Sequence, residues 1–261
     1  MTVRSQIFCA RDAFFTLLKK EIIRFKKVAF HTIAAPVLSS LLYLIVFGVA
    51  LQGRVPTDTQ TPYLDFLVPG LVMMAVMQNA FANSSSSFVQ SKISGTLTFL
   101  LVTPMGSTMI AAAYILSATL RGLIVGLCVW AGTAIWITPT LYSVGWIFSF
   151  ALLGAFIMAA LGLITAIWAD RYEQMGVIQT FFIMPLTFLS GVFYSCKALP
   201  NPWQDLTAFN PLYYLIDGFR GGFLGHFETN PFMASIWGIG ACALVFSVSI
   251  WLLKTGYKTK N

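Results

Sequence analysis

Charged residues are scarce in this chain: they make up 10% of its 261 residues, whereas 57% are hydrophobic. Soluble domains carry about 25% charged residues, so this chain cannot cover a folded core with a polar surface. Acidic residues are the fewest, 9 against 16 lysines and arginines, which gives a formal net charge of +7. The lack of charge excludes a soluble domain, and lipid must surround much of the molecule.

Cysteine and histidine are also rare, and their spacing gives no metal site. No cysteine belongs to a Cys-x-x-Cys pair, and neither histidine has a partner at ligand spacing. The phosphate loop G-x-x-x-x-G-K-[ST], the zinc motif H-E-x-x-H and the nucleophile motif G-x-S-x-G are all absent. We therefore expect no catalytic residue, no bound metal and no cofactor in this chain, which is not an enzyme by itself.

Six apolar segments are long enough to cross a membrane, because a transmembrane helix needs about 20 mostly apolar residues. They are residues 29–51, 63–88, 108–137, 143–168, 175–195 and 231–254. Three contain a proline (Pro36, Pro69 and Pro185), which membrane helices tolerate when neighbours satisfy the freed carbonyl groups. The sequence predicts an all-α integral membrane protein with six transmembrane helices in a single domain over residues 1–261.

The basic residues are distributed unevenly around these spans. With six spans, the N-terminus, the second and fourth loops and the C-terminus share one side, which holds twelve lysines and arginines. The opposite side holds three, and Arg121 lies within a span. The positive-inside rule places both termini in the cytoplasm. Because the basic residues gather at the membrane edges, they indicate orientation rather than nucleic-acid binding.

Residues 11–27 precede the first span and have an apolar face formed by Phe14, Leu18, Ile22 and Phe25. The lysines lie mostly elsewhere, which is typical of a basic amphipathic helix at the membrane surface. The other interpretation is an ordinary positively charged flank of the first span. A cleavable signal is not expected, since a basic segment of 28 residues precedes the first apolar run.

Two connections are too apolar for free loops. The longest, residues 196–230 on the outer side, is aromatic but interrupted by proline and glycine, so it favours short helices in the outer leaflet. The cytoplasmic loop 90–107 carries an apolar stripe of Leu97, Leu100 and Leu101. Either a partner protein covers this stripe in a matching groove, or the stripe folds back onto the membrane.

Polar residues inside the spans are the candidate functional positions, because such residues are costly in lipid. Arg121 lies about 13 residues into the third span. Either it faces a polar passage and attracts an anionic part of a substrate, or it pairs with Asp65 or extends to the surface. Asn79 and Asn83 belong to a polar run in the second span, which either lines a gate or holds neighbouring helices together. Asn79, Asn83 and Arg121 are therefore the candidate passage residues.

Four segments in order resemble one protein family. They are YLDFLVPGLVMM (63–74), ISGTLTFLLVTPM (93–105), PLTFLSGVFYSCKALP (185–200) and FNPLYYLIDGFRGGFLG (209–225). Together they resemble the permease subunits of type-2 ATP-binding cassette (ABC) exporters, including small bacterial drug, nodulation-factor and polysaccharide exporters. The third segment is the most specific, and the resemblance covers nearly the whole chain.

The resemblance implies a homodimer in the bacterial inner membrane, docked on two cytoplasmic ABC ATPase subunits that bind the ATP and Mg²⁺. By position, 11–27 would be the amphipathic elbow helix, 93–104 the coupling helix and 196–225 the outer re-entrant segment. The substrate passage would lie at the dimer interface. Contact with the ATPase would involve Leu97, Leu100, Leu101 and Pro104. Thr98 stands where the family often has a glutamate, which removes one charge from that contact.

Two other functional classes are less consistent with the residues. A secondary transporter or channel acting alone would need ionisable couplers in the membrane interior or an internal repeat, and neither is visible. An intramembrane enzyme would need a paired nucleophile and base at membrane depth. The sequence therefore favours a permease that exports an amphipathic, lipid-, glycan- or drug-like substrate with energy from another chain, and it leaves the identity of that substrate open.

Overall fold

Long helices make up most of the computed structural model, which describes residues 3–51, 62–103, 105–135 and 141–257. Within these residues, five helices are long and apolar enough to cross a membrane. They are α1 (Val3–Leu51), α2 (Tyr63–Ile93), α4 (Ser107–Ala134), α5 (Val144–Trp168) and α10 (Pro231–Thr255). The described residues contain no strand, which confirms the all-α class.

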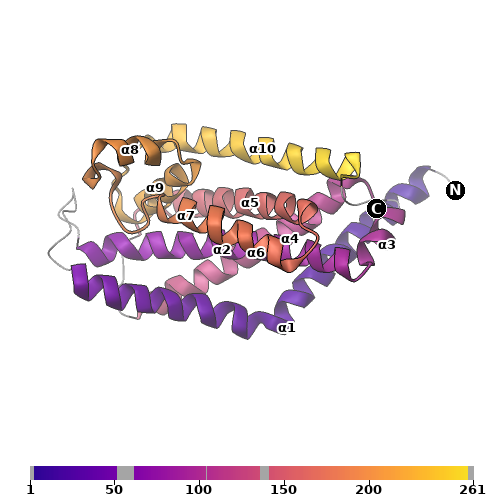
Figure 1. Ribbon diagram of the computed structural model, residues 1–261, viewed down its shortest axis with the longest axis horizontal. Coiled ribbons are helices and arrows are strands. Elements are labelled where there is room, and N and C mark those ends of the chain that lie inside the picture. The colour runs from indigo at the N-terminus through magenta and orange to yellow at the C-terminus, as the bar shows by residue number, and fades with distance from the viewer. Residues whose placement is uncertain (1–2, 52–61, 104, 136–140, 258–261) are drawn as a thin grey trace.

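The bundle has two distinct ends (Figure 1). One end carries the short helix α3 (Thr96–Val102), together with the start of α1 and the end of α10. The other end carries α8 (Asn201–Ala208) and α9 (Pro211–Leu224). These ends are named the α3 end and the α8 end below.

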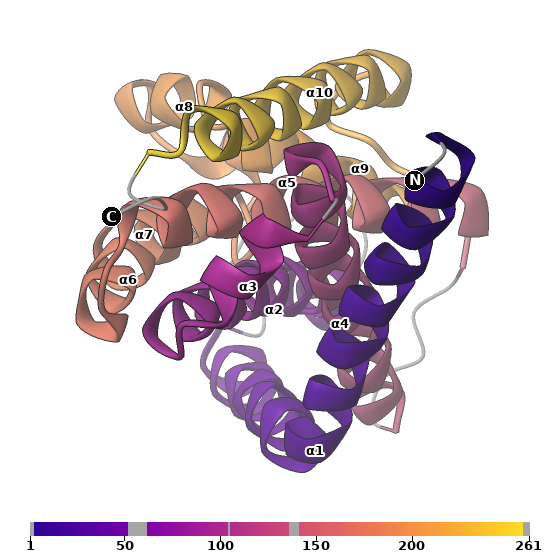
Figure 2. The same ribbon diagram turned by 90° about the vertical axis from the view of Figure 1, so that its right-hand side faces the viewer.

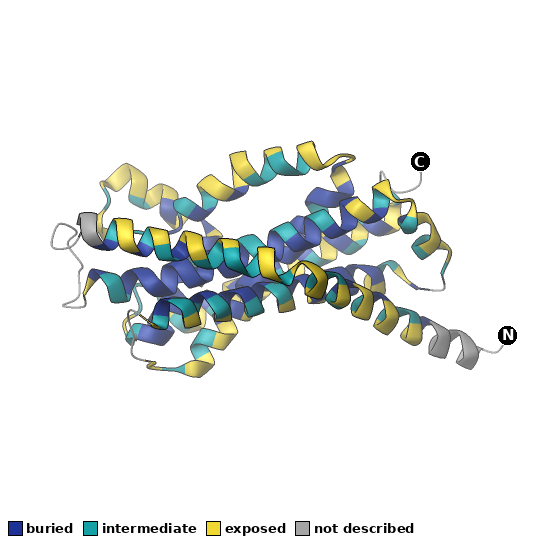
Figure 3. Ribbon diagram, turned by 90° about the horizontal axis from the view of Figure 1, so that it is seen from below, coloured by how far each residue is buried: buried dark blue, intermediate teal, exposed yellow. Residues whose placement is uncertain are grey.

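Helix α2 is the central helix of the bundle. It packs against α1, α4, α5 and α9, and Figure 2 shows it enclosed among its neighbours. In its most apolar window 78% of the residues are buried, against 11% in α1 and 17% in α10. Figure 3 shows buried residues gathered inside the bundle and exposed residues on its outer helices. The exposed apolar faces of α1 and α10 would be unfavourable in water, so they suit contact with lipid.

Glycines allow α4 and α5 to approach α2 closely. A Cβ atom built on Gly122 of α4 would lie 2.7 Å from the carbonyl oxygen of Val76, and one on Gly126 would overlap the Val76 side chain. A Cβ atom on Gly162 of α5 would lie 2.5 Å from the carbonyl oxygen of Phe81. Backbone-to-backbone approach at small residues is a common way to hold membrane helices together.

The predicted surface helix and first span form one helix rather than two. Helix α1 runs without interruption from Val3 to Leu51, with Pro36 inside it, and it bends along its length in Figure 1. At 1.5 Å per residue its 49 residues extend roughly 74 Å, more than twice the thickness of a bilayer core. The separate helix expected over 11–27 is therefore not seen. The basic residues of the segment 11–27 lie within α1 and do not interrupt the helix.

The predicted span over 175–195 contains a π-helical segment and ends early. It consists of α6 (Tyr172–Ile178), the π-helical segment η1 (Gln179–Ile183) and α7 (Met184–Phe188). A turn follows, in which Gly191 has a φ of +75°, a conformation that favours glycine. The helical residues thus end at Phe188, so five rather than six helices of the described residues meet the length for a span.

The remaining predicted elements agree closely with the structure. Helices α2, α4, α5 and α10 cover the predicted spans, although residues 136–137 lie outside the described residues. The region 196–225 contains η2 (Cys196–Ala198), α8 and α9, which agrees with the expectation of short helices there.

Candidate functional site

Asn83 lies at the centre of a polar cluster between α1, α2 and α4. Its side-chain oxygen accepts a hydrogen bond from Arg121 Nη1 at 2.6 Å and another from Arg24 Nη2 at 3.2 Å. Arg121 also donates to Thr32 Oγ1 at 3.1 Å and lies over the ring of Phe25. Asn83 is only 3% exposed, so three helices meet at one buried amide.

Glu21 of α1 brings a carboxylate to this cluster although it is 2% exposed. Its Oε2 accepts a hydrogen bond from Ser87 Oγ and lies 3.5 Å from Arg24 Nε. Its Oε1 lies 3.5 Å from Lys20 Nζ. Arg24 in turn donates to Gln90 Oε1 at 2.7 Å. A buried charge is tolerated only when it is paired and hydrogen-bonded, so these contacts stabilise the carboxylate of Glu21. They also join the early part of α1 to the end of α2.

Arg121 has no carboxylate partner among the salt bridges of the described residues. The pair with Asp65, one interpretation of the sequence, is not formed, and Arg121 Nε is buried without a hydrogen-bond partner. Arg24 and Arg121 share Asn83, and within the described part of the chain Glu21 is the carboxylate beside them. The polar cluster, defined as Glu21, Arg24, Asn83 and Arg121, therefore carries a surplus positive charge.

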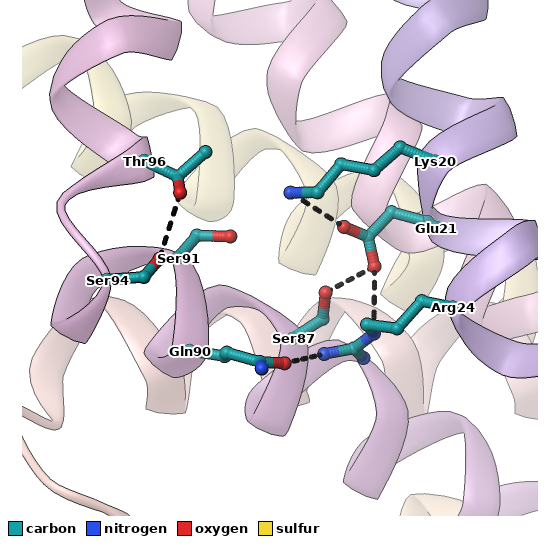
Figure 4. A pocket seen from close by; sticks show the side chains of 8 residues that line it. All are labelled: Lys20, Glu21, Arg24, Ser87, Gln90, Ser91, Ser94 and Thr96. Carbon is teal, nitrogen blue, oxygen red and sulfur yellow. Dashed lines mark hydrogen bonds and ion pairs between the residues drawn. The ribbon is translucent and has the colours of Figure 1, made fainter. Parts of the chain in front are cut away.

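A pocket of about 210 Å³ lies beside the cluster, between α1, the end of α2 and the start of α3. Figure 4 shows the charged side chains of α1 facing hydroxyl and amide groups of α2. The lining residues are Lys20, Glu21, Arg24, Ser87, Gln90, Ser91, Ser94 and Thr96. This lining is polar, and it links the polar cluster to the first residue of α3.

The structure brings together two of the three candidate passage residues. Asn83 and Arg121 are in direct contact. Asn79 is separate, because its amide donates to the carbonyl oxygen of Ala75 in its own helix at 3.0 Å. Sequence reasoning missed Glu21 and Arg24. A signal was present: an acid and a base at positions i and i+3 of an amphipathic helix lie on one face.

Helix α3 exposes a different apolar face from the one expected. Leu97 is 4% exposed, and Leu100 and Leu101 are half-buried against the core. Phe99 and Val102 are 78% and 83% exposed. Leu97 is therefore not available to a partner, because the leucine stripe packs toward the bundle. Pro104, the fourth expected contact, lies outside the described residues.

A second buried polar group holds α9 at the α8 end. Arg220, 4% exposed, donates to the carbonyl oxygen of Gly191 at 2.5 Å and lies 3.7 Å from the ring centre of Phe66. Asp217 accepts hydrogen bonds from the backbone and hydroxyl of Thr229. Burial raises the pKa of Asp217, since it disfavours the charged carboxylate. These contacts join α9 to the turn after α7 and to the segment before α10.

Comparison with known proteins identifies the kind of molecule that carries this architecture. The family model of the ABC-2 type transporter matches residues 12–224. The chain belongs to the ABC-2 type transporter family. It is 38% identical over 206 residues to the inner membrane transport permease YadH of Escherichia coli K12, which covers 79% of this chain and 80% of YadH. It is 27% identical over 221 residues to nodulation protein J of Rhizobium meliloti, with 79% of each chain covered.

Membership of the ABC-2 type transporter family confirms the resemblance drawn from the four sequence segments. The matched region includes the polar cluster, the pocket and α3. Together with the apolar helices, it makes the chain a multi-pass membrane protein and a transport subunit. The described residues contain no group of three metal-binding side chains.

Proposed function

We propose that this chain is the permease subunit of an ABC exporter, and that it moves an amphipathic, lipid-, glycan- or drug-like substrate outward across the inner membrane. ATP hydrolysis on a separate ATPase subunit, which binds the ATP and Mg²⁺, supplies the energy. The observation that carries the proposal is the exposed apolar face of α3, formed by Phe99 and Val102, in a chain of this family. Such a face favours a protein partner with a matching groove.

The distribution of basic residues supports a cytoplasmic position for the α3 end. Lys19, Lys20, Lys26 and Lys27 belong to the part of α1 near that end, and Lys254 belongs to the last turn of α10. By the positive-inside rule both termini then lie in the cytoplasm. The printed name of the Escherichia coli relative, an inner membrane transport permease, supports the same membrane for this chain.

The path of the chain supports a sixth crossing. Helix α5 ends at the α3 end, whereas α8 lies at the α8 end (Figure 1). The segment α6–η1–α7 and the turn after it run between the two ends. A π-helical segment is a local irregularity that an α-helix accepts, so η1 does not prevent a crossing. The outer helices α8 and α9 would then be the re-entrant segment of the outer leaflet.

Two copies of the chain and two ATPase subunits complete the proposed exporter, with the passage between the copies. Closure of the ATPases on ATP would move α3 and favour one of two states of the membrane dimer. The surplus positive charge of the polar cluster, which Arg24 and Arg121 supply, would suit an anionic part of the substrate. Membrane lipid covers the exposed faces of α1 and α10.

The test combines Phe99→Asp with Val102→Asp and measures how much ATPase subunit co-purifies from native membranes in mild detergent. Two carboxylates on the exposed face of α3 would have to lose their hydration in an apolar groove, so we expect the partner to be lost. Tyr257→Asp is the matched control, since Tyr257 is an exposed aromatic residue at the same end of the bundle. Equal recovery of the ATPase with both variants would refute the docking role of α3.

A further inference from the structure

Lys92 connects two separate junctions of the bundle at the α3 end. Its ammonium donates hydrogen bonds to the carbonyl oxygens of Ile167 at 3.0 Å and Ala169 at 2.8 Å. It also lies 3.2 Å from Asp170 Oδ1. Lys92 belongs to the last turn of α2, whereas its three partners stand where α5 ends and leads to α6.

The chemistry of this contact is that of a cation at the C-terminus of a helix. The last carbonyl groups of an α-helix have no partner within it, and they form the negative end of the helix dipole. An ammonium group has three donors, and Lys92 directs them to three acceptors. The side chain of Lys92 is 12% exposed, so little water competes for these bonds. An aliphatic side chain of the same length would leave the carbonyl groups without this donor.

Lys92 is attached to α3 through a short and ordered turn. Only Ile93, Ser94 and Gly95 separate it from the first residue of α3. The amide of Gly95 donates to the carbonyl oxygen of Lys92 at 3.1 Å, and Gly95 has a φ of +71°. Because this turn is tight, a displacement of α3 moves the end of α2 and therefore Lys92.

On its other side, Lys92 is attached to the start of the irregular helical segment α6–η1–α7. The amide of Asp170 donates to Gln174 Oε1 at 2.8 Å, which joins the junction to the first turns of α6. None of the residues of α6 is buried, so apolar packing holds this helix weakly. The π-helical segment η1 follows directly, and such segments interrupt the regular hydrogen bonding of an α-helix.

We propose that Lys92 is a positioning residue that transmits the displacement of α3 to α6 and η1. The bond to the end of α5 makes the α2–α3 turn and the α5–α6 junction move as one body. The transmission role rests on the proposed docking of the ATPase on α3, whereas the rigid link between α3 and α6 does not. The two parts are therefore tested separately.

The first experiment measures the link in the purified chain in lipid nanodiscs. Spin labels at Thr98 of α3 and Val177 of α6, both exposed, report the distance between the two helices in a chain whose four native cysteines are replaced. With Lys92 present we expect a narrow distance distribution. Lys92→Met loses the narrow distribution, and Lys92→Arg, which keeps a charged donor, restores it. Lys254→Met is the matched control, since Lys254 is an exposed lysine in the last turn of α10.

Asp170→Asn distinguishes a helix cap from a simple ion pair. The cap retains two carbonyl acceptors, so we expect the narrow distribution to survive in Asp170→Asn. The exchange Lys92→Glu with Asp170→Lys would restore an ion pair but not the cap, because a carboxylate cannot donate to carbonyl oxygens. A distribution unchanged in Lys92→Met would overturn the proposed link, and one restored by the charge exchange would overturn the helix cap in favour of a simple ion pair.

The second experiment adds the co-purified ATPase and compares samples without nucleotide and with ATP and vanadate. Labels at Val177 and at Ile236, which is exposed on α10, follow the movement of α6 against the bundle. We expect a nucleotide-dependent shift that Lys92→Met loses while ATP hydrolysis continues, since the docking face of α3 is intact. A shift retained in Lys92→Met would overturn the transmission role. Failure of any ATPase to co-purify with the unmodified chain would refute the proposed function and leave the first experiment valid.

Discussion

Asn83 shows how a single neutral side chain holds two charged ones inside a membrane protein. One amide oxygen accepts from both Arg24 and Arg121, which come from different helices. An amide oxygen has two lone pairs, so both bonds are compatible with its chemistry. The two guanidinium groups repel each other, and Glu21, the carboxylate of the cluster, pairs with Arg24 and Lys20 but not with Arg121. Asn83 is therefore the residue on which the arrangement of the cluster depends.

Replacement of Asn83 by leucine should lower the thermal stability of the purified protein. The change removes an acceptor from two partly buried guanidinium groups, and an unsatisfied buried donor costs about 1–3 kcal/mol. Asn83→Asp should preserve or raise the melting temperature, because a carboxylate between two arginines neutralises the surplus charge. Asn79→Leu is the control, since Asn79 bonds only its own helix backbone. Equal shifts for Asn83→Leu and Asn79→Leu would contradict a special role for Asn83.

For single residues, the sequence identifies the rare polar side chains in apolar segments but not their contact partners. Arg121 and Asn83 stood out because charge and amides are unusual in apolar segments. Their contact, and the contact of Asn83 with Arg24, joins residues far apart in the chain, which no local pattern encodes. Glu21 and Arg24 belong to the segment 11–27, which the sequence predicts at the membrane surface. On α3 nearly every position is apolar, so periodicity could not tell Leu97 from Phe99 as the exposed face.

Among the helices, the close contact of α4 with α2 depends on small residues of α4. Gly122→Ala should destabilise the protein, because the added methyl group would lie 2.7 Å from the Val76 carbonyl oxygen. Gly240→Ala in α10 is the matched control, since nothing lies within 4 Å of a Cβ atom there. The control should be neutral or stabilising by up to about 1 kcal/mol from helix propensity. Thermal denaturation of both variants in detergent tests this, and equal behaviour would contradict the close α2–α4 contact.

The length of an apolar run predicts a helix more reliably than it predicts where that helix is interrupted. The bounds of α5 and α10 follow from hydropathy because polar or turn-forming residues flank them, whereas α2 continues past the predicted residue 88 to Ile93. The continuity of α1 was missed because a boundary was expected where basic residues give way to apolar ones, between residues 27 and 29. No glycine or proline lies there, and charge alone does not end a helix. The early end at Phe188 was missed because Ser190 and Gly191 lie within an apolar run, although glycine after a helix is a known stop signal.

For the whole molecule, the proposed topology predicts which end reacts with a reagent that cannot cross the membrane. In a chain without native cysteines, Asn201→Cys of α8 should be labelled in intact cells by an impermeant thiol reagent. Thr98→Cys of α3 and Arg171→Cys before α6 should be labelled only after the cells are opened. All three positions are exposed. Labelling of Asn201→Cys and Arg171→Cys from the same side would exclude a crossing by α6–η1–α7.

The contacts of α1 have a consequence for the synthesis of the protein. Arg24 bonds a residue 59 positions later in the chain, and Thr32 bonds one 89 positions later. At about 5–20 residues per second, a ribosome needs roughly 3–18 seconds to supply these partners. During that time Glu21 and Arg24 cannot enter lipid without a large cost. The charged early part of α1 must therefore stay in water at the membrane surface, and it completes its packing only after α2 and α4 have been inserted.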